Sequence, residues 1–304
     1  MSVVGIGCNN FGWRLDEQGT RDVVDAAIDA GITLFDTADI YGNKGGSEEL
    51  LGTVLKGRRE QIVLATKFGH QQAPMGYDDG LGPMGGRAYI RYAVEQSLRR
   101  LQTDYIDLYQ IHTPDPVTPI DETLSALHEL VLEGKVRTIG SSQFAGWQVV
   151  QAAHVASENH LTPFISAQNQ WSLLERDIEA ELVPAAIQYG IGVLPFFPLA
   201  SGLLTGKVRR GTEWPTNSRL EDREGSVSTA QIDVIEALAE WSEVNGHTLL
   251  ETAIGVLAAT QPVASVIAGA TSPDQVRMNA AAAEWVPTKQ QIAEVSTITG
   301  PPTD

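Results

Sequence analysis

The chain has 304 residues, which is enough for one large α/β barrel or for two ordinary domains. Its 21 basic and 38 acidic residues give a formal charge of -17, which argues against nucleic acid or an anionic membrane as a partner, because both are recognised mainly through basic patches. The single cysteine, Cys8, rules out an internal disulfide and indicates a reducing, cytoplasmic setting, and no apolar run approaches the length of a membrane span.

Short apolar runs rich in β-branched residues recur along the whole chain, a pattern that is typical of buried strands. Eight such runs lie at residues 3–7, 32–37, 61–67, 105–112, 136–142, 164–170, 192–198 and 264–270. Amphipathic stretches with apolar residues at i, i+3 and i+4 separate several of them, at residues 21–31, 47–57, 88–101 and 121–134. The chain therefore alternates between predicted strands and predicted helices.

Eight strands alternating with helices predict a single (β/α)8 barrel, of the TIM-barrel class, over residues 1–304. A doubly wound sheet in two domains is the alternative, but it would normally carry GxGxxG after the first strand, and GIGCNNFG does not match. Three segments depart from the minimal repeat. They are a loop at 70–86 after the third strand, a loop at 199–228 after the seventh, and a final helix near 287–298. Long loops of this kind are usually functional lids or mobile segments, and the loop at 70–86 is expected to border the active site.

Ionisable side chains stand where several of these strands end. FDTADIYG carries Asp36 and Tyr41, ATKFG carries Lys67, and YQIHTPD carries His112. Barrel enzymes place their chemistry on the loops at the C-terminal ends of the strands. Neighbouring strands lie ~4.8 Å apart, so these side chains can converge. The pattern predicts a site that donates a proton to a carbonyl oxygen.

Tyr41 is the expected general acid. A free phenol has a pKa near ~10, which is too high for effective proton transfer at neutral pH, and a nearby ammonium such as Lys67 would lower it. Asp36 would keep the lysine charged, and His112 would orient the carbonyl. None of the four is a hydride source, so the hydride must come from a cofactor, for which a nicotinamide is the expected choice.

Each of these residues also has an ordinary structural interpretation. Asp36 could bind backbone N–H groups, Lys67 could face solvent, and Tyr41 could be an aromatic residue of a turn. His112 could be a hydrogen-bonded structural histidine. Taken singly these interpretations are at least as good, but four such residues at consecutive strand ends favour a shared site.

The motifs resemble those of the aldo-keto reductase family, in the same order and along almost the whole chain. FDTADIYG, TKFG, QIHTPDP, PLASGLLTGK and GATSPDQVRMNAA carry the resemblance. It implies a catalytic tetrad of Asp36, Tyr41, Lys67 and His112. It also implies a cofactor, NADP(H) or less often NAD(H), which the family binds in an extended conformation without a Rossmann fold.

The resemblance also assigns cofactor contacts. Ser142, Gln143 and Gln168 match positions that hydrogen-bond the nicotinamide carboxamide, and Trp171 matches the aromatic residue that stacks on the ring. The implied contacts along the pyrophosphate are Phe197, Pro198, Leu199, Gly202, Leu203 and Lys207. The implied contacts to the adenosine phosphate are Gly269, Thr271 and Ser272, and Gln275 and Asn279 match positions that face the adenine.

Several positions depart from the family pattern or have another interpretation. Gln143 stands where the family usually has Asn, and Phe197 replaces a common Ser near the pyrophosphate. Thr271 occupies the position at which many NADP-dependent members place Arg or Lys against the 2′-phosphate, which weakens the case for NADP over NAD. Gln275 and Asn279 could instead be solvated positions on a helix.

Aromatic side chains are expected to line an open substrate pocket, although each of them could instead pack in the barrel core. The set is Phe11, Trp13, Tyr41, Phe68, Trp171 and Trp214. The family often has an N-terminal hairpin that plugs the bottom of the barrel. Either this plug is missing, which would expose Ser2 and Val3, or the recorded start is late.

The leading functional expectation is NADP(H)-dependent reduction of an aldehyde or ketone to an alcohol, with Tyr41 as the proton donor and without a metal. The alternatives are an NAD-linked sugar or alcohol dehydrogenase and a catalytically weak nucleotide-sensing subunit. A Schiff-base aldolase that uses Lys67 is disfavoured, because Asp36 would keep the lysine charged. The expected partner is a small carbonyl or alcohol substrate, and the sequence leaves the oligomeric state open.

Overall fold

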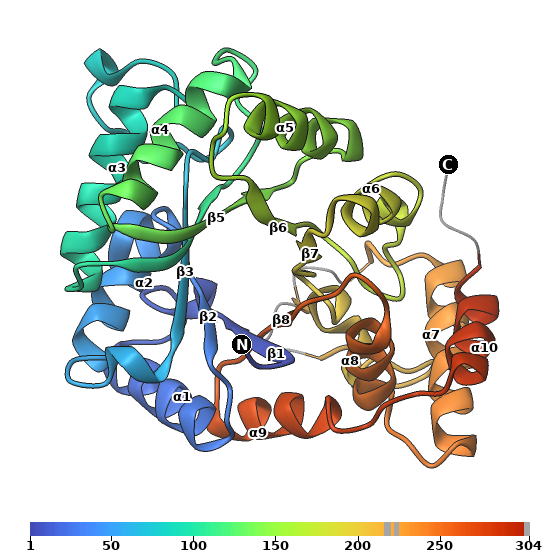
Figure 1. Cartoon of the computed structure of the whole chain (residues 1–304). Helices are drawn as coiled ribbons and strands as arrows, with labels where there is room; N and C mark the ends of the chain where they lie inside the picture. Colours follow the sequence, from blue (N-terminus) through green and yellow to red (C-terminus); the bar gives the residue numbers. More distant parts are fainter. Residues whose placement is uncertain (216–219, 222–224, 301–304) are drawn as a thin grey trace.

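Eight parallel strands form the centre of the molecule (Figure 1). The structure is a computed structural model and describes residues 1–215, 220–221 and 225–300. The strands are β1 (Val4–Gly7), β2 (Leu34–Asp36), β3 (Val63–Phe68), β4 (Ile106–Ile111), β5 (Val136–Ser142), β6 (Phe164–Gln168), β7 (Gly192–Val193) and β8 (Val266–Gly269). They pair in the order β7-β6-β5-β4-β3-β2-β1-β8, and every pair is parallel. Each strand predicted from the sequence is present.

Backbone hydrogen bonds between the β7 and β8 segments close the sheet into a barrel. Ala264 N donates to Val193 O at 2.8 Å, and Ile267 N donates to Pro195 O at 2.9 Å. The seventh strand ends earlier than predicted, because Pro195 has no N–H to donate and Phe197 has a φ of 52°. The predicted (β/α)8 barrel is confirmed.

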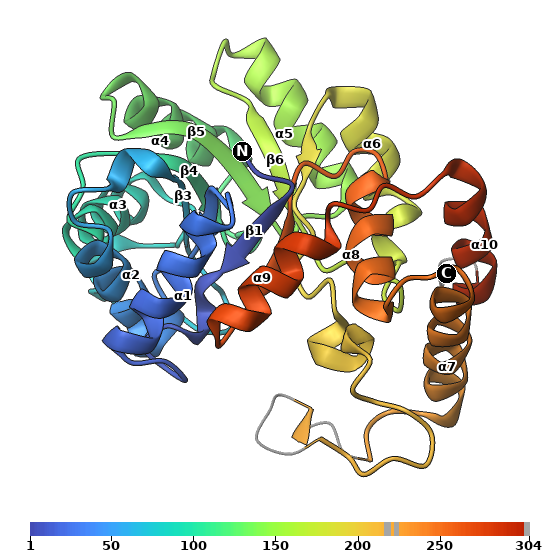
Figure 2. The same ribbon diagram turned by 90° about the horizontal axis from the view of Figure 1, so that it is seen from below.

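Helices cover the outside of the barrel (Figure 1). Those around the strands are α1 (Glu17–Asp29), α2 (Tyr41–Val54), α3 (Arg87–Leu101), α4 (Ile120–Leu132), α5 (Gly146–Glu158), α6 (Leu182–Tyr189), α8 (Leu249–Ala259) and α9 (Pro273–Ala282). The predicted final helix is α10 (Lys289–Thr299), and α7 (Thr229–Val244), which was not predicted, packs beside it outside the ring of helices (Figures 1 and 2). In the part of the chain that the structure describes, no helix is both long enough and apolar enough to cross a membrane.

The barrel interior changes from apolar to polar toward the C-terminal ends of the strands. One apolar layer consists of Leu34, Ala65, Leu108, Leu194 and Ile267. Two residues further along β2, β3 and β4 stand Asp36, Lys67 and Gln110, each at most 3% exposed. Alternate residues of a strand face the same side, so these polar side chains lie directly above the apolar layer. The larger apolar core fills the space between the sheet and the surrounding helices.

The two predicted long loops follow β3 and β7. The loop at 70–86 contains a short 3-10 helix, η3 (Asp79–Leu81). The loop at 199–228 begins with η5 (Ala200–Thr205), and its residues 216–219 and 222–224 lie outside the described part of the chain. Figure 2 shows the described residues that follow η5 and precede α7 lying away from the barrel.

Candidate active site

Lys67, on β3, is fully buried at the centre of the site. Its Nζ lies 2.6 Å from Asp36 Oδ2, 3.0 Å from Thr37 O and 3.5 Å from Tyr41 Oη. An ammonium has three N–H donors, and these three acceptors match them. The structure thus brings Asp36, Tyr41 and Lys67 together from β2, α2 and β3.

Tyr41 is held above Lys67 by an unusual backbone. It is the first residue of α2, and residues 42–44 directly after it have φ values of 66°, 60° and 68°. Such left-handed conformations are costly for residues other than glycine. A Cβ on Gly42 would lie 2.5 Å from Ser47 N, so the turn packs too closely to admit a side chain there.

Burial and charge together set the protonation of Lys67 and Tyr41. Burial by itself lowers the pKa of Lys67, but the carboxylate of Asp36 and the phenol of Tyr41 outweigh it, so the pKa is raised. Burial raises the pKa of Tyr41, and Lys67 offsets only part of that increase. This direction is opposite to the lowered pKa of Tyr41 that the sequence predicts. The lysine acts in the expected direction, but desolvation of the phenolate is the larger effect, and both groups are protonated at neutral pH.

His112 follows β4 and points its ring at Tyr41. The two rings meet edge to face, with centroids 5.8 Å apart and an interplanar angle of 82°. Burial and then the charge of Lys67 hold the pKa of His112 well below its usual value, so the imidazole is neutral. Its Nδ1 is buried without a hydrogen-bond partner among the described residues.

The second carboxylate oxygen of Asp36 accepts two amide hydrogen bonds. Gln110 Nε2 donates to it at 3.2 Å, and Gln168 Nε2 donates to it at 2.9 Å. Gln110 was not predicted, although its position two residues before His112 places it on the inward face of the strand. Gln168 lies at the predicted strand end, but its amide nitrogen binds Asp36 in this structure.

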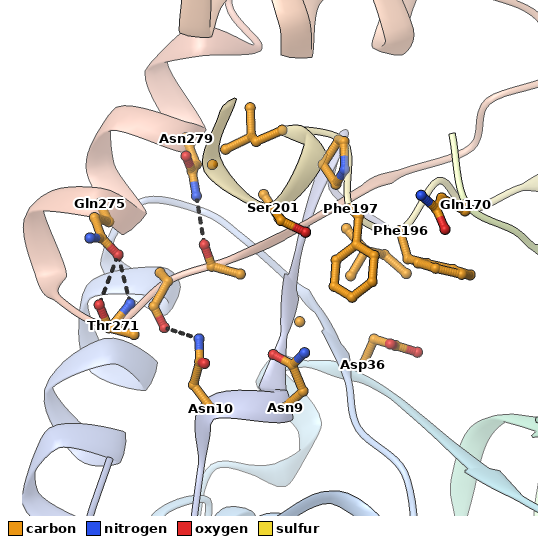
Figure 3. A pocket seen from close by; sticks show the side chains of 18 of the residues that line it. Asn9, Asn10, Asp36, Gln170, Phe196, Phe197, Ser201, Thr271, Gln275 and Asn279 are labelled. Carbon is orange, nitrogen blue, oxygen red and sulfur yellow. Dashed lines mark hydrogen bonds between the residues drawn. The ribbon is translucent and has the colours of Figure 1, made fainter. Parts of the chain in front are cut away.

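One cavity of about 690 Å³ lies above this group and extends to the start of α9 (Figure 3). The predicted residues that line it are Asp36, Tyr41, His112, Ser142, Gln143, Gln168, Phe197, Pro198, Leu199, Gly202, Lys207, Gly269, Thr271, Gln275 and Asn279. Figure 3 shows Asp36 and Phe196 toward one side of the pocket and Thr271 and Gln275 toward the other.

Three aromatic residues predicted at the site are part of the core instead. Trp171 is 2% exposed and its indole N–H donates to Glu179 at 2.9 Å, so its ring does not line the cavity. Phe11 is fully buried, and so is Phe68, which stacks on Tyr109 with centroids 4.7 Å apart. Phe68 directly follows Lys67 on β3, so its side chain points to the opposite face of the sheet.

Four further predicted residues also lie away from the cavity lining. Leu203 is buried in a second apolar cluster that includes residues of α7 and α8. Ser272 caps the N-terminus of α9, as its hydroxyl accepts a hydrogen bond from a backbone N–H of that helix. Trp13 is 59% exposed, and Trp214 packs against the second cluster with its indole N–H bonded to a backbone carbonyl.

Sequence reasoning missed several residues that line the cavity. Phe196 is partly buried at the end of the seventh strand segment. The two adjacent phenylalanines in PFFP were the sequence signal that pointed to it. His70 lines the cavity immediately after the TKFG motif, and Gln170 lines it two residues after β6. Arg14 and Lys207 are the lining cations, and neither has a carboxylate within 4.0 Å among the residues that the structure places.

Gln143 connects two strand ends. Its backbone has a φ of 59°, and its Nε2 donates to His112 O at 3.1 Å. Its backbone N–H donates to Gln168 O at 2.9 Å. The side chain that departs from the family pattern therefore reaches the backbone beside the imidazole.

Polar groups at the far end of the cavity are bonded to one another. Gln275 Oε1 accepts from Thr271 N at 2.8 Å and from Thr271 Oγ1 at 3.1 Å. Asn279 Nδ2 lies 3.5 Å from a backbone oxygen of β8. Arg277 forms an exposed ion pair with Asp274 and does not line the cavity. Over the described ranges, no group of three or more His, Cys, Asp or Glu side chains could hold a metal ion.

Comparison with known proteins agrees with this architecture. The model of the aldo/keto reductase family matches residues 3–299. The uncharacterized oxidoreductase YrpG of Bacillus subtilis (strain 168) is 41% identical over 230 residues, which are 73% of this chain and 70% of YrpG. A probable aldo-keto reductase 1 of Glycine max is 41% identical over 227 residues, 73% of this chain and 62% of that protein.

A third relative carries a different kind of name. It is a probable voltage-gated potassium channel subunit beta of Oryza sativa subsp. japonica, 33% identical over 288 residues, which are 91% of this chain and 85% of that protein. The chain belongs to the aldo/keto reductase family. It is therefore an oxidoreductase by family, and the family generally binds nicotinamide cofactors, usually NADP(H).

Proposed function

We propose that this protein reduces an aldehyde or ketone to the alcohol with NADP(H), and that Tyr41 delivers the proton. The observation that carries the proposal is the position of Lys67 Nζ, 2.6 Å from Asp36 and 3.5 Å from the phenol of Tyr41. His112 lies beside the same phenol, and both side chains line the same cavity. A protonated phenol and a neutral imidazole facing one cavity suit a carbonyl oxygen, which accepts hydrogen bonds.

The cavity fits a nicotinamide dinucleotide. Its volume of about 690 Å³ lies within the range of cofactor sites, about 300–1,000 Å³. Phe196 offers an aromatic face near the tetrad, and Lys207 is a lining cation for the pyrophosphate. Gly202, with a φ of 109°, lets the backbone approach an anion closely. A bound nicotinamide supplies the hydride that none of these side chains can provide.

The chain's own residues supply the proton. Tyr41 and His112 hold the carbonyl oxygen and orient the carbon toward the cofactor. As negative charge develops on that oxygen, Tyr41 transfers its proton, and the adjacent Lys67 ammonium stabilises the phenolate that remains. Asp36 keeps Lys67 charged through the step, and solvent then returns a proton to Tyr41.

The Tyr41→Phe variant tests this mechanism. It removes only the hydroxyl, so we expect carbonyl reduction to fall by about 10²-fold or more while binding of NADPH, followed by fluorescence titration, changes little. Tyr189→Phe is the matched control, because Tyr189 bonds to His154 on the outer helices. Reduction at the wild-type rate by Tyr41→Phe would overturn the proposal.

The choice of NADP(H) rests on family usage, and an NAD-linked sugar or alcohol dehydrogenase is the competing form of the same chemistry. The absence of an Arg or Lys at Thr271 favours the competitor. Parallel titrations with NADPH and NADH, together with rates of reduction and of alcohol oxidation, separate the two. Tighter binding and faster turnover with NADH would replace NADP(H) in the proposal.

A nucleotide-sensing subunit with little turnover is the second candidate. The relative named as a voltage-gated potassium channel subunit beta favours it. This function predicts tight nucleotide binding with negligible single-turnover reduction of a broad panel of carbonyls. The intact Asp36–Lys67–Tyr41 group supports the reductase instead.

The free Cys8 supports a cytoplasmic location for either function.

A further inference from the structure

A second buried ion pair lies behind the tetrad, on the other face of β3. Glu48, on α2, is fully buried, and its Oε2 accepts a hydrogen bond from Arg100 Nε at 2.7 Å. Its Oε1 accepts one from the hydroxyl of Thr66 at 2.6 Å. Thr66 directly precedes Lys67 on β3, so the two side chains point to opposite faces of the sheet. The reduction mechanism uses neither member of this ion pair.

Arg100, near the end of α3, also packs against the turn that holds Tyr41. Gly45 belongs to the non-helical segment after Tyr41 and has a φ of 112°, a conformation that favours glycine. A Cβ on Gly45 would lie 2.6 Å from Arg100 Cδ and 3.0 Å from Arg100 Nε. The arginine side chain therefore occupies the space directly beside the backbone that carries the phenol.

A third contact joins Arg100 to the loop at 70–86. Arg100 Nη2 donates to Tyr77 Oη at 3.2 Å. The preceding residue of the loop, Gly76, lies close to the same turn of α2, because a Cβ on Gly76 would lie 3.4 Å from Lys44 Nζ. One guanidinium thus contacts α2 and the loop after β3 at the point where these two segments meet.

The charges of this cluster balance. Burial by itself lowers the pKa of Arg100, but the carboxylate of Glu48 and the phenol of Tyr77 outweigh it, so the pKa is raised and the guanidinium stays charged. Burial and then the charge of Glu48 hold the pKa of Asp39 well above its usual range, so Asp39 is neutral. Glu48 is therefore the carboxylate that balances Arg100.

We propose that Arg100 is a positioning residue for the proposed carbonyl reduction, on which this inference rests. Through Glu48 and Thr66 it fixes the part of β3 that carries Lys67. Its contact with the turn after Tyr41 fixes the phenol. The phenol and the ammonium come from different elements and lie 3.5 Å apart, and one planar, rigid group contacts both elements.

The double variant Glu48→Gln/Arg100→Met removes the ion pair without leaving a lone buried charge. Gln keeps an acceptor for Thr66, and Met replaces the stem of the arginine. In a single turnover with NADPH and saturating 4-nitrobenzaldehyde, we expect hydride transfer to slow by about 10-fold to 100-fold, because small misplacements of catalytic groups have effects of this size. The Kd for NADPH should change by less than about twofold, since the loss belongs to the transition state.

Two single variants support this test. Arg91→Met is the matched control on α3, because Arg91 pairs with Glu129 and Glu133 at the surface, and it should keep the wild-type rate. Arg100→Lys keeps the charge beside Glu48 but lacks the planar fork, so hydride transfer should slow by about threefold to tenfold. This variant keeps the proposal testable if thermal melting shows that the double variant does not fold.

The Tyr41→Phe background separates positioning from a general structural effect. Residues that act as one unit have non-additive effects, so the loss caused by each Arg100 variant should shrink to less than about twofold when the phenol is already absent. A general loosening of the barrel would instead slow the residual reaction by the same factor in both backgrounds.

The other outcomes would overturn one proposal or both. Wild-type rates in the Arg100 variants, or equal losses with and without the phenol of Tyr41, would overturn the assignment of Arg100 and leave the proposed function intact. Weaker NADPH affinity with unchanged hydride transfer would also overturn it, because the pair would then serve the cofactor. A wild-type rate in Tyr41→Phe alone would overturn the proposed function, and this inference with it.

Discussion

The two ends of the cavity are built differently. At the tetrad end, Lys67 is fully buried and its hydrogen bonds join β2, β3 and α2. At the far end, Thr271 and Gln275 bond to each other within one short segment, and that contact is exposed. Removing a residue from the first end disturbs several elements at once, whereas removing one from the second disturbs only its neighbour. The hydrogen bonds at the tetrad end are therefore tied to the stability of the barrel, and those at the end proposed to bind the nucleotide are not.

The largest effect is expected from Lys67→Met. The substitution leaves the carboxylate of Asp36 buried without its cation, so we expect a loss of about 3–5 kcal/mol in the free energy of unfolding, together with loss of reductase activity. Denaturant unfolding measures the first and a carbonyl assay the second. Lys56→Met, at an exposed position after α2, is the matched control and should lie within about 0.5 kcal/mol of the wild type. If Lys67→Met were as stable as the control, the tetrad end would not be tied to the stability of the barrel.

A smaller effect is expected from pH. Burial and the charge of Lys67 lower the pKa of His112, so the unfolded chain takes up a proton near pH ~6.5 that the folded protein takes up only at lower pH. Stability should be full above pH ~6.5 and fall as the pH drops toward the lowered pKa, by up to about 1.4 kcal/mol per pH unit for one proton. Melting temperatures of the wild type and of His112→Gln across this range measure the difference. An equally steep fall in the variant would show that His112 does not contribute.

The smallest effect is expected at the far end of the cavity. Gln275→Ala removes the acceptor for Thr271 at an exposed contact, so its free energy of unfolding should change by no more than about 0.5 kcal/mol. Reduction of a saturating carbonyl should be unchanged, and any effect should appear in the affinity for the nucleotide. A destabilisation comparable to that of Lys67→Met would show that the two ends are equally constrained.

The sequence was sufficient where local position determines geometry. Asp36, Lys67 and His112 were located because each ends a strand, and parallel strands in a barrel bring their ends to one rim. Gln110 shares that inward face but stands before the end of its strand, so a pattern of strand-end residues does not indicate it. The net pKa direction of Tyr41 was missed for a different reason: the depth of burial depends on packing that no motif displays.

Aromatic residues were the least predictable part of the site. Residue type alone does not show whether a ring faces the cavity or the core, and Trp171 and Phe68 face the core. The alternation along β3 places Phe68 opposite Lys67, so that error was avoidable from the sequence. The position of Phe196 was harder to predict, because Pro195 ends the regular strand just before it and removes the alternation on which such an argument depends.

Lys67 also limits the reactions that the site can perform. An amine attacks a carbonyl only when it has a free electron pair and room to move. The raised pKa keeps this nitrogen protonated, and all three of its hydrogens are directed at Asp36, Thr37 and Tyr41. A carbonyl compound in the cavity therefore meets no nucleophilic nitrogen from this lysine. The same contacts that support Tyr41 protect reactive substrates from imine formation with Lys67.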